Sequence, residues 1–140
     1  MTARGIRNNN AGNLRHGSKW DGLRPEQTDP DFCQFVSMAY GCRALIKTLI
    51  TYHCRYGLST VAGIIRRWAP PNENDTAAYS RAVAAGIGKP EHQRLDFEDD
   101  PALYVDIARM IARHENGKDA ALITSDDWEE GARLAGLILG

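Results

Sequence analysis

The amino-acid sequence predicts a single mainly α domain whose N-terminal third is rich in loops. Apolar residues recur at helical spacing between residues 40 and 139, and capping side chains, glycines or prolines bound each such stretch. Residues 1–31 instead contain many Gly and Asn, with one short strand or hairpin expected around residues 13–20. A chain of 140 residues, 43% of them hydrophobic, suffices for one core, so residues 1–140 are expected to form one domain.

The first long helix is predicted over residues 40–56. Leu45, Leu49 and Tyr52 follow helical spacing within this stretch. Gly57 stands directly after it, where a glycine commonly ends a helix.

Two shorter helices are predicted next. Ser59 is expected to cap a helix that runs through Trp68, where a pair of prolines stops it. Asn74 or Asp75 caps the following helix, and residues 88–90 break it.

The last two helices are predicted over residues 102–116 and from residue 125 to residue 139. Asp100 is placed to cap the first of them, Pro101 to open it and Gly117 to end it. Acidic side chains gather at the start of the second, where they suit the helix dipole.

Glu115 is the main candidate for chemistry, because it lies on the apolar stripe of the helix over residues 102–116. Tyr104, Ala108, Ile111 and Glu115 are spaced i, i+4, i+7 and i+11, so they share one face. Burial and the negative end of the helix dipole both favour the protonated acid there. A glycosidase uses such an acid to protonate the leaving oxygen of a sugar linkage. The alternative is that Glu115 is a solvated residue of the last helical turn.

Composition narrows the classes of function. A net charge of −1 with 25% charged residues favours neither nucleic acid nor a membrane as the general partner. Basic residues gather before residue 25, where they suit an anionic polymer such as a peptidoglycan stem peptide. We expect no signal peptide and no membrane span, because no apolar run is long enough. The 3 cysteines and 4 scattered histidines form no ligand motif, so neither a metal ion nor a cofactor is expected.

A first resemblance lies at the N-terminus. Residues 4–15, RGIRNNNAGNLR, resemble the opening of small phage and prophage virion proteins that begin RGIRNNNPGNIR, with Ala11 in place of their proline. This resemblance implies a virion-associated protein and leaves its activity open. The likeness continues over more than half of the chain, through residues 20–22, 32–35, 40–44 and 67–76.

A second resemblance bears on chemistry. Residues 73–83, ENDTAAYSRAV, look like the stretch E-T-x-x-Y-V-x-x-V of lytic transglycosylases, a lysozyme-like family in which the tyrosine lies beside the catalytic glutamate. The resemblance therefore implies that Tyr79 positions Glu115. Residues 107–116 look similar to the end of that family's catalytic helix, A-I-x-x-E-S, but the two stretches occur in the opposite order. A circularly permuted lysozyme-like domain would reconcile the order, and residues 8–20 would then line the cleft.

Three residues are proposed to be catalytic under this resemblance, namely Glu115, Tyr79 and Glu73. Glu73 stands just ahead of a helix N-terminus, which favours its ionised form. The alternative for Glu73 and Asp75 is that they cap the helix. If they face Glu115, two carboxylates whose pKa values are shifted in opposite directions form a glycosidase pair.

The predicted substrate-binding residues are Asn10, Asn13, Trp20 and Asp75. Asparagine amides both donate and accept hydrogen bonds, which suits the N-acetyl and hydroxyl groups of a glycan. Asparagine also tolerates left-handed turns, so shaping the loop is the alternative for Asn10 and Asn13. Trp20 can stack on a sugar face, whereas Trp68 is expected in the core.

The leading hypothesis is a peptidoglycan-cleaving muramidase or lytic transglycosylase of phage or prophage origin, with Glu115 as general acid. It would cleave the β-1,4 linkage between N-acetylmuramic acid and N-acetylglucosamine. Such an enzyme would bind glycan strands and virion proteins. It would be located in the virion, or in the bacterial cytoplasm before release, and it would act at the periplasmic cell wall. The alternative is a non-catalytic virion structural or glycan-binding protein on the same scaffold. Nucleic-acid contact is the weakest hypothesis, because the basic loop lacks interleaved aromatic residues.

Overall fold

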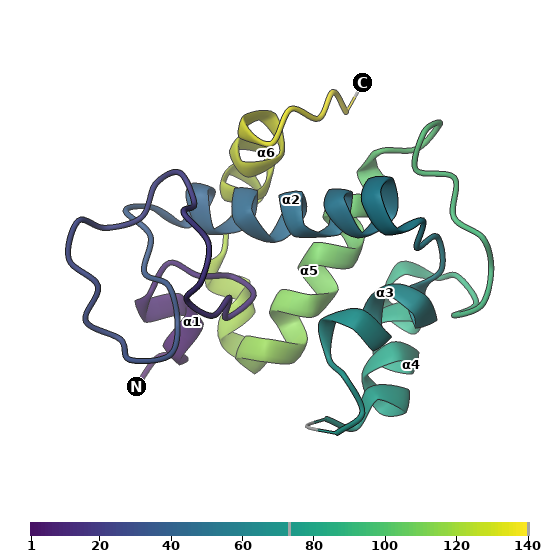
Figure 1. Ribbon diagram of the computed structural model, residues 1–140, viewed down its shortest axis with the longest axis horizontal. Helices are drawn as coiled ribbons and strands as arrows, with labels where there is room; N and C mark the ends of the chain where they lie inside the picture. The colour runs from purple at the N-terminus through teal and green to yellow at the C-terminus, as the bar shows by residue number, and fades with distance from the viewer. Residues whose placement is uncertain (73, 140) are drawn as a thin grey trace.

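The computed structural model describes residues 1–72 and 74–139, and the fold is mainly helical, as predicted. Figure 1 shows the long helix α2 across the molecule, with α6 on one side of it, α5 on the other, and α3 and α4 beside α5. The N-terminal segment covers the opposite end of α2 and α5. In chain order the helices are α1 (Arg4–Arg7), α2 (Met38–Tyr56), α3 (Val61–Trp68), α4 (Thr76–Ile87), α5 (Ala102–Asn116), the 3₁₀ helix η1 (Gly117–Leu122) and α6 (Ser125–Leu134).

Capping residues explain most helix ends. Gly57 ends α2 in the left-handed conformation, at φ 68°, as predicted. Asp75 caps α4 by accepting a hydrogen bond from the backbone N–H of Ala78. The prediction of Ser59 as the cap of α3 is wrong by one residue, because Thr60 has the extended backbone and accepts from the first turn.

The limits of α5 and α6 differ in part from the prediction. Pro101 occupies the cap position of α5, and the carbonyl oxygen of Asp100, in place of its side chain, accepts from the first turn. Helix α6 begins at Ser125 behind a capping box and ends at Leu134, not at residue 139. Gly136, at φ 90°, turns the chain away just beyond that end.

The predicted strand or hairpin around residues 13–20 is reduced to isolated bridges. Arg15 pairs with Phe32, and Leu23 pairs with Phe35, without a longer ladder among the described residues. The short helices α1 and η1 were not predicted, since four to six residues are too few to carry a periodic apolar pattern. None of the described helices is long and apolar enough to span a membrane.

One apolar core joins the helices. Leu45 of α2, Ile64 of α3, Val83 of α4 and Ile107 of α5 are all buried in it. Ala11 of the N-terminal segment also belongs to this core. The prediction that the helices over residues 40–56, 76–85 and 102–116 pack around one core, with the N-terminal loop over one side, is confirmed.

Polar side chains hold the N-terminal segment in place. The fully buried Asn10 donates through Nδ2 to the carbonyl oxygens of Leu14 and Cys33, and accepts from the N–H of Leu14, each at 2.9 Å. The Arg4 guanidinium donates to Asp29 at 2.7 Å and holds the pKa of that carboxyl well below its usual range. These bonds join distant parts of the N-terminal segment to one another.

Two asparagines give the segment its turns. Asn9 and Asn13 have φ values of 52° and 51°, in the left-handed region that asparagine tolerates better than most residues. Gly41 of α2 lies so close to the carbonyl oxygen of Asn9 that a Cβ atom would collide with it. The loop and α2 therefore touch backbone to backbone.

Candidate active site

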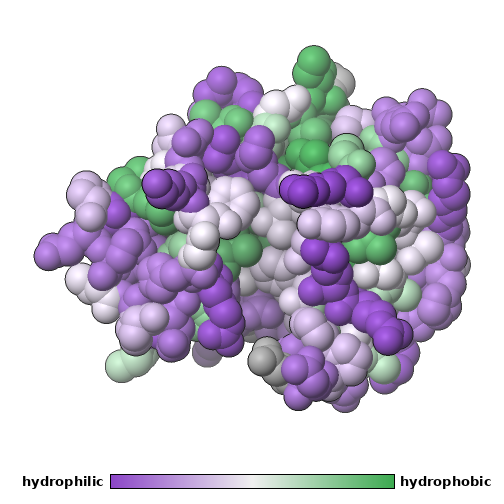
Figure 2. Space-filling view, in the orientation of Figure 1, coloured by the Kyte–Doolittle hydropathy of each residue, from purple (hydrophilic) through white to green (hydrophobic). Residues whose placement is uncertain are grey.

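A cleft separates the N-terminal segment from the end of α3. Figure 2 shows this face hollowed between the two parts, with hydrophilic residues along its sides. Glu115, in the last turn of α5, lines the cleft between these walls. The other lining residues are Gly12, Asn13, Leu14, Arg15 and Phe32 from the N-terminal segment, Tyr52 from α2, and Trp68, Ala69, Pro70 and Asn74 from α3 and the loop after it.

The carboxyl group of Glu115 is held from both sides. Its Oε2 accepts a hydrogen bond from the hydroxyl of Tyr79 at 2.8 Å. Its Oε1 lies 3.4 Å from Nδ2 of Asn13. The predicted contact between Tyr79 and Glu115 is therefore present, and the side chain is half-buried in place of being solvated on a frayed turn.

Tyr79 is buried between three partners. Its ring stacks on that of His114, with centroids 3.6 Å apart and planes inclined by 21°. Its hydroxyl oxygen accepts from Nε1 of Trp68 at 3.0 Å and donates to Glu115. Burial raises the pKa of Tyr79, and the adjacent carboxylate raises it further, so the phenol stays a neutral donor at physiological pH.

Two predicted substrate-binding residues have structural roles. Asn10 is buried and its amide is occupied by Leu14 and Cys33, so it shapes the loop where contact with substrate was predicted. Asp75 lies outside the cleft and caps α4, in agreement with the capping alternative. The predicted roles of Glu73 lie outside the described residues.

The two remaining predicted residues lie at the cleft or next to it. Asn13 contacts Glu115 directly, and its left-handed backbone also shapes the loop. Trp20 lines a neighbouring groove that shares Leu14, Arg15 and Tyr52 with the cleft. This groove extends the cleft along α2.

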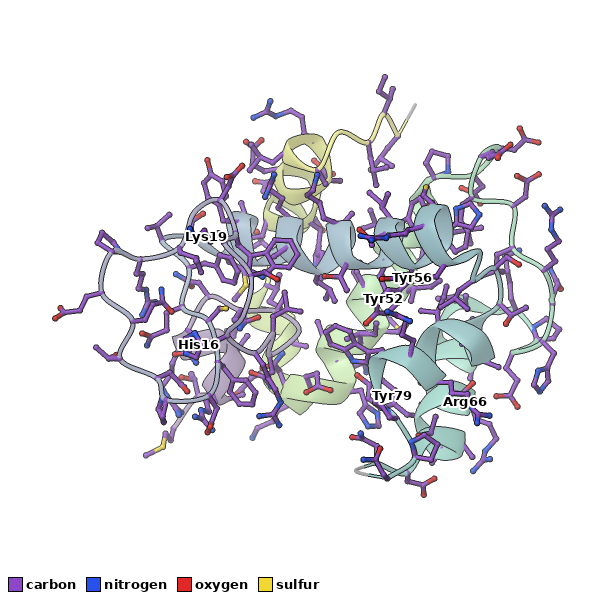
Figure 3. The ribbon with its side chains drawn as sticks, in the orientation of Figure 1. His16, Lys19, Tyr52, Tyr56, Arg66 and Tyr79 are labelled. Atoms are coloured by element: carbon purple, nitrogen blue, oxygen red, sulfur yellow. The ribbon has the colours of Figure 1, made fainter. Side chains whose placement is uncertain are left out.

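Sequence reasoning missed part of the cleft wall. Tyr52 was assigned to the apolar stripe of α2, yet it lines both the cleft and the neighbouring groove. Trp68 packs against the core as expected, but it is half-buried, and its Nε1 donates to Tyr79. Figure 3 shows Tyr52 and Tyr79 on one side of the opening and His16 and Lys19 in the N-terminal segment on the other. The proline pair after Trp68, which ends α3 at the surface, was the signal that could have identified its position.

The charge of the cleft is simple. Among the described residues that line it, Glu115 is the one acidic and Arg15 the one basic side chain. No group of three or more His, Cys, Asp or Glu side chains in the described parts of the chain is placed to hold a metal ion. The described lining of the cleft therefore holds one carboxyl group and one guanidinium among uncharged side chains.

Comparison with known proteins identifies the family. No protein-family model matches this chain. The chain is 41% identical over 133 residues to Protein P5 of Pseudoalteromonas phage PM2, an alignment that covers 92% of this chain and 79% of that protein. At this identity and coverage, the chain belongs to the same family as phage PM2 Protein P5.

Proposed function

We propose that this phage-related protein cleaves the β-1,4 bond between N-acetylmuramic acid and N-acetylglucosamine in peptidoglycan, as a hydrolase or a lytic transglycosylase. The observation that carries the proposal is the Glu115 carboxyl group, which lines a cleft and is held by the hydroxyl of Tyr79 at 2.8 Å. A general acid has to be fixed in this way next to an open binding site. The two partners were expected together from the resemblance to lytic transglycosylases.

The proposed reaction begins with proton transfer from Glu115 to the glycosidic oxygen. The bond between that oxygen and C1 of N-acetylmuramic acid breaks, and its electron pair stays with the oxygen, which leaves as a hydroxyl group. Water, or the 6-hydroxyl of the same sugar, then attacks C1. The attacking oxygen releases its proton to the Glu115 carboxylate, which restores the acid. Glu73 stays the candidate for a second carboxylate.

A contact between distant parts of the chain supports the circular permutation. The backbone N–H of Ala3 donates to a carboxylate oxygen of Asp119 at 2.7 Å, so the start of the chain lies beside the residues that follow α5. The loop over residues 8–20 therefore follows the Glu115 helix in space, as a permuted lysozyme-like domain requires. Helix α6 is then an addition after the permuted domain.

Replacement of Glu115 by Gln tests the proposal. Glutamine keeps the shape of the side chain but has no acidic proton, so wall-degrading activity should fall on the order of 10²- to 10⁴-fold. The matched control is Glu129→Gln, which changes an exposed carboxylate of α6 away from the cleft and should keep wild-type activity. The measurement is the loss of turbidity of purified peptidoglycan, with circular dichroism to confirm folding.

Two further results test the mechanism. Equal activity of Glu115→Gln and wild type would remove Glu115 from the mechanism. Mass spectrometry of the released fragments distinguishes the two reactions, because a hydrolase leaves a reducing end and a lytic transglycosylase leaves a 1,6-anhydro sugar.

A second candidate function is a non-catalytic virion structural or glycan-binding protein. The shared family with a phage protein supports this candidate, because it agrees with a phage origin and the name of that relative gives no catalytic activity. Its prediction is that the protein is found in purified virions and pulls down with peptidoglycan, while the wild type releases no fragments at any pH or from any wall source.

A further inference from the structure

Trp68 holds the hydroxyl group of Tyr79 from the side opposite to Glu115. Its Nε1 lies 3.0 Å from the Tyr79 oxygen, which in turn lies 2.8 Å from Oε2 of Glu115. The three side chains come from α3, α4 and α5, so the chain of contacts crosses the site. Trp68 is also one of the residues that line the cleft.

The donors and acceptors in this chain allow only one direction. An indole N–H donates and never accepts, so the Tyr79 oxygen accepts from Trp68. The single hydrogen of the phenol is then directed to Oε2 of Glu115. Both oxygens of Glu115 therefore face donors, the Tyr79 hydroxyl at Oε2 and Nδ2 of Asn13 at Oε1.

The stack with His114 makes this assignment firm. With the two rings 3.6 Å apart at their centroids, the Tyr79 ring is fixed, and only the hydroxyl hydrogen is free to rotate. Without Trp68 that hydrogen has a choice between donating to Glu115 and pointing away from it.

We infer that Trp68 is a positioning residue, which fixes the direction of the Tyr79 hydroxyl so that its hydrogen points to Oε2 of Glu115. The catalytic consequence rests on the proposed glycosidase function, whereas the direction of the hydrogen bonds does not. When Glu115 gives up its proton, the Tyr79 hydrogen bond already stabilises the resulting carboxylate.

The catalytic part is tested by a double-mutant cycle on peptidoglycan cleavage. Trp68→Phe keeps an aromatic ring but loses the donor, so kcat should fall about 2- to 10-fold with KM within about 2-fold, the size of one hydrogen bond. In a Tyr79→Phe background the same change should have no effect on kcat, because Trp68 acts through the hydroxyl. An equal loss in both backgrounds would overturn the inference. Trp128→Phe, a buried change in α6, is the control that should be additive.

The hydrogen bond itself is tested by NMR without reference to activity. The indole N–H signals of the 3 tryptophans are assigned with Phe variants, and Tyr79→Phe should move only the Trp68 signal upfield. An unchanged Trp68 signal would overturn the inference at its first step. If the signal moves but the wild type cleaves no peptidoglycan, the proposed function fails while the direction of the hydrogen bonds is supported.

Discussion

The N-terminal segment, residues 1–37, and the helical body, residues 38–139, are stabilised by different interactions. The body buries apolar side chains such as Leu45, Ile64 and Ile107 in one core. Apart from Ala11, which joins that core, the buried apolar side chains of the segment form a small cluster around Phe35. The segment also depends on buried amides, above all that of Asn10, and on the ion pair between Arg4 and Asp29. Burial is cooperative and non-directional, whereas hydrogen bonds fix exact positions. The candidate cleft lies at the junction of the two regions, so one of its walls is stiffened by packing and the other is shaped by directed hydrogen bonds.

The two regions meet where side chains are small or polar. Asn116 of α5 donates through Nδ2 to the carbonyl oxygen of Ala11 at 2.9 Å. Gly5 packs so closely on the side chain of Asn116 that a Cβ atom would collide with it. The junction thus depends on a few exact contacts. Substitutions in the N-terminal segment and in the helical body should therefore change the stability of the protein in different ways.

The largest change in stability is expected in the body. Ile107→Ala removes a fully buried side chain from the core and should lower the free energy of unfolding by about 2–5 kcal/mol. Urea denaturation followed by circular dichroism measures this change. Because the core is one cooperative unit, the transition should remain single, and a second transition would show that the two regions unfold separately.

A smaller effect, confined to the loop, is expected from Asn10→Ala. It leaves three backbone groups of Leu14 and Cys33 without their partner and should lower the free energy of unfolding by about 1–3 kcal/mol. Hydrogen exchange should speed up first in the N-terminal segment, and Gln93→Ala, an exposed amide, is the control. Uniform acceleration over the whole chain would contradict the independence of the loop.

The smallest effect at neutral pH, but a pH-dependent one, is expected from Asp29→Asn. The Arg4 guanidinium lowers the pKa of Asp29 in the folded state, so its contribution to stability is complete above the unfolded pKa of about 3.9 and is lost as the pH falls below that value. The melting temperature of the wild type should therefore exceed that of Asp29→Asn at pH 5–7, and the difference should begin to shrink below about pH 4 and keep shrinking toward the lowered folded-state pKa. A difference in melting temperature that does not change with pH would mean that the substitution acts through the shape of the side chain and not through its charge.

The helices could be predicted from the sequence because their signals are local. Glycines 57, 88 and 117 end three helices as expected, and Asp75 caps α4 from its place in the chain. The end of α6 was overestimated because apolar residues continue beyond Leu134 while Gly136 turns the backbone.

The site was predictable only where a resemblance joined distant residues. The pair Tyr79 and Glu115 came from such a likeness, and neither spacing nor composition contained it. The sequence left two roles open for Asn10, because its partner Cys33 lies 23 positions away, and an amide that binds glycan looks the same in sequence as one that binds backbone. For Trp68 only the contact with the core was predicted, because an aromatic residue on an amphipathic helix suits both a core and a cleft.

The contact between Asn13 and Glu115 joins residues 102 positions apart, and this sets the order in which the cleft forms during synthesis. At translation rates of about 5–20 residues per second, the loop leaves the ribosome roughly 5–20 s before the helix that carries the acid. During that interval the buried amide of Asn10 has its partners at Leu14 and Cys33, but the opposite wall is missing. The cleft is therefore completed by one of the last helices to emerge, and a nascent chain interrupted before α5 carries Asn13 and the partners of Asn10 but lacks the acid.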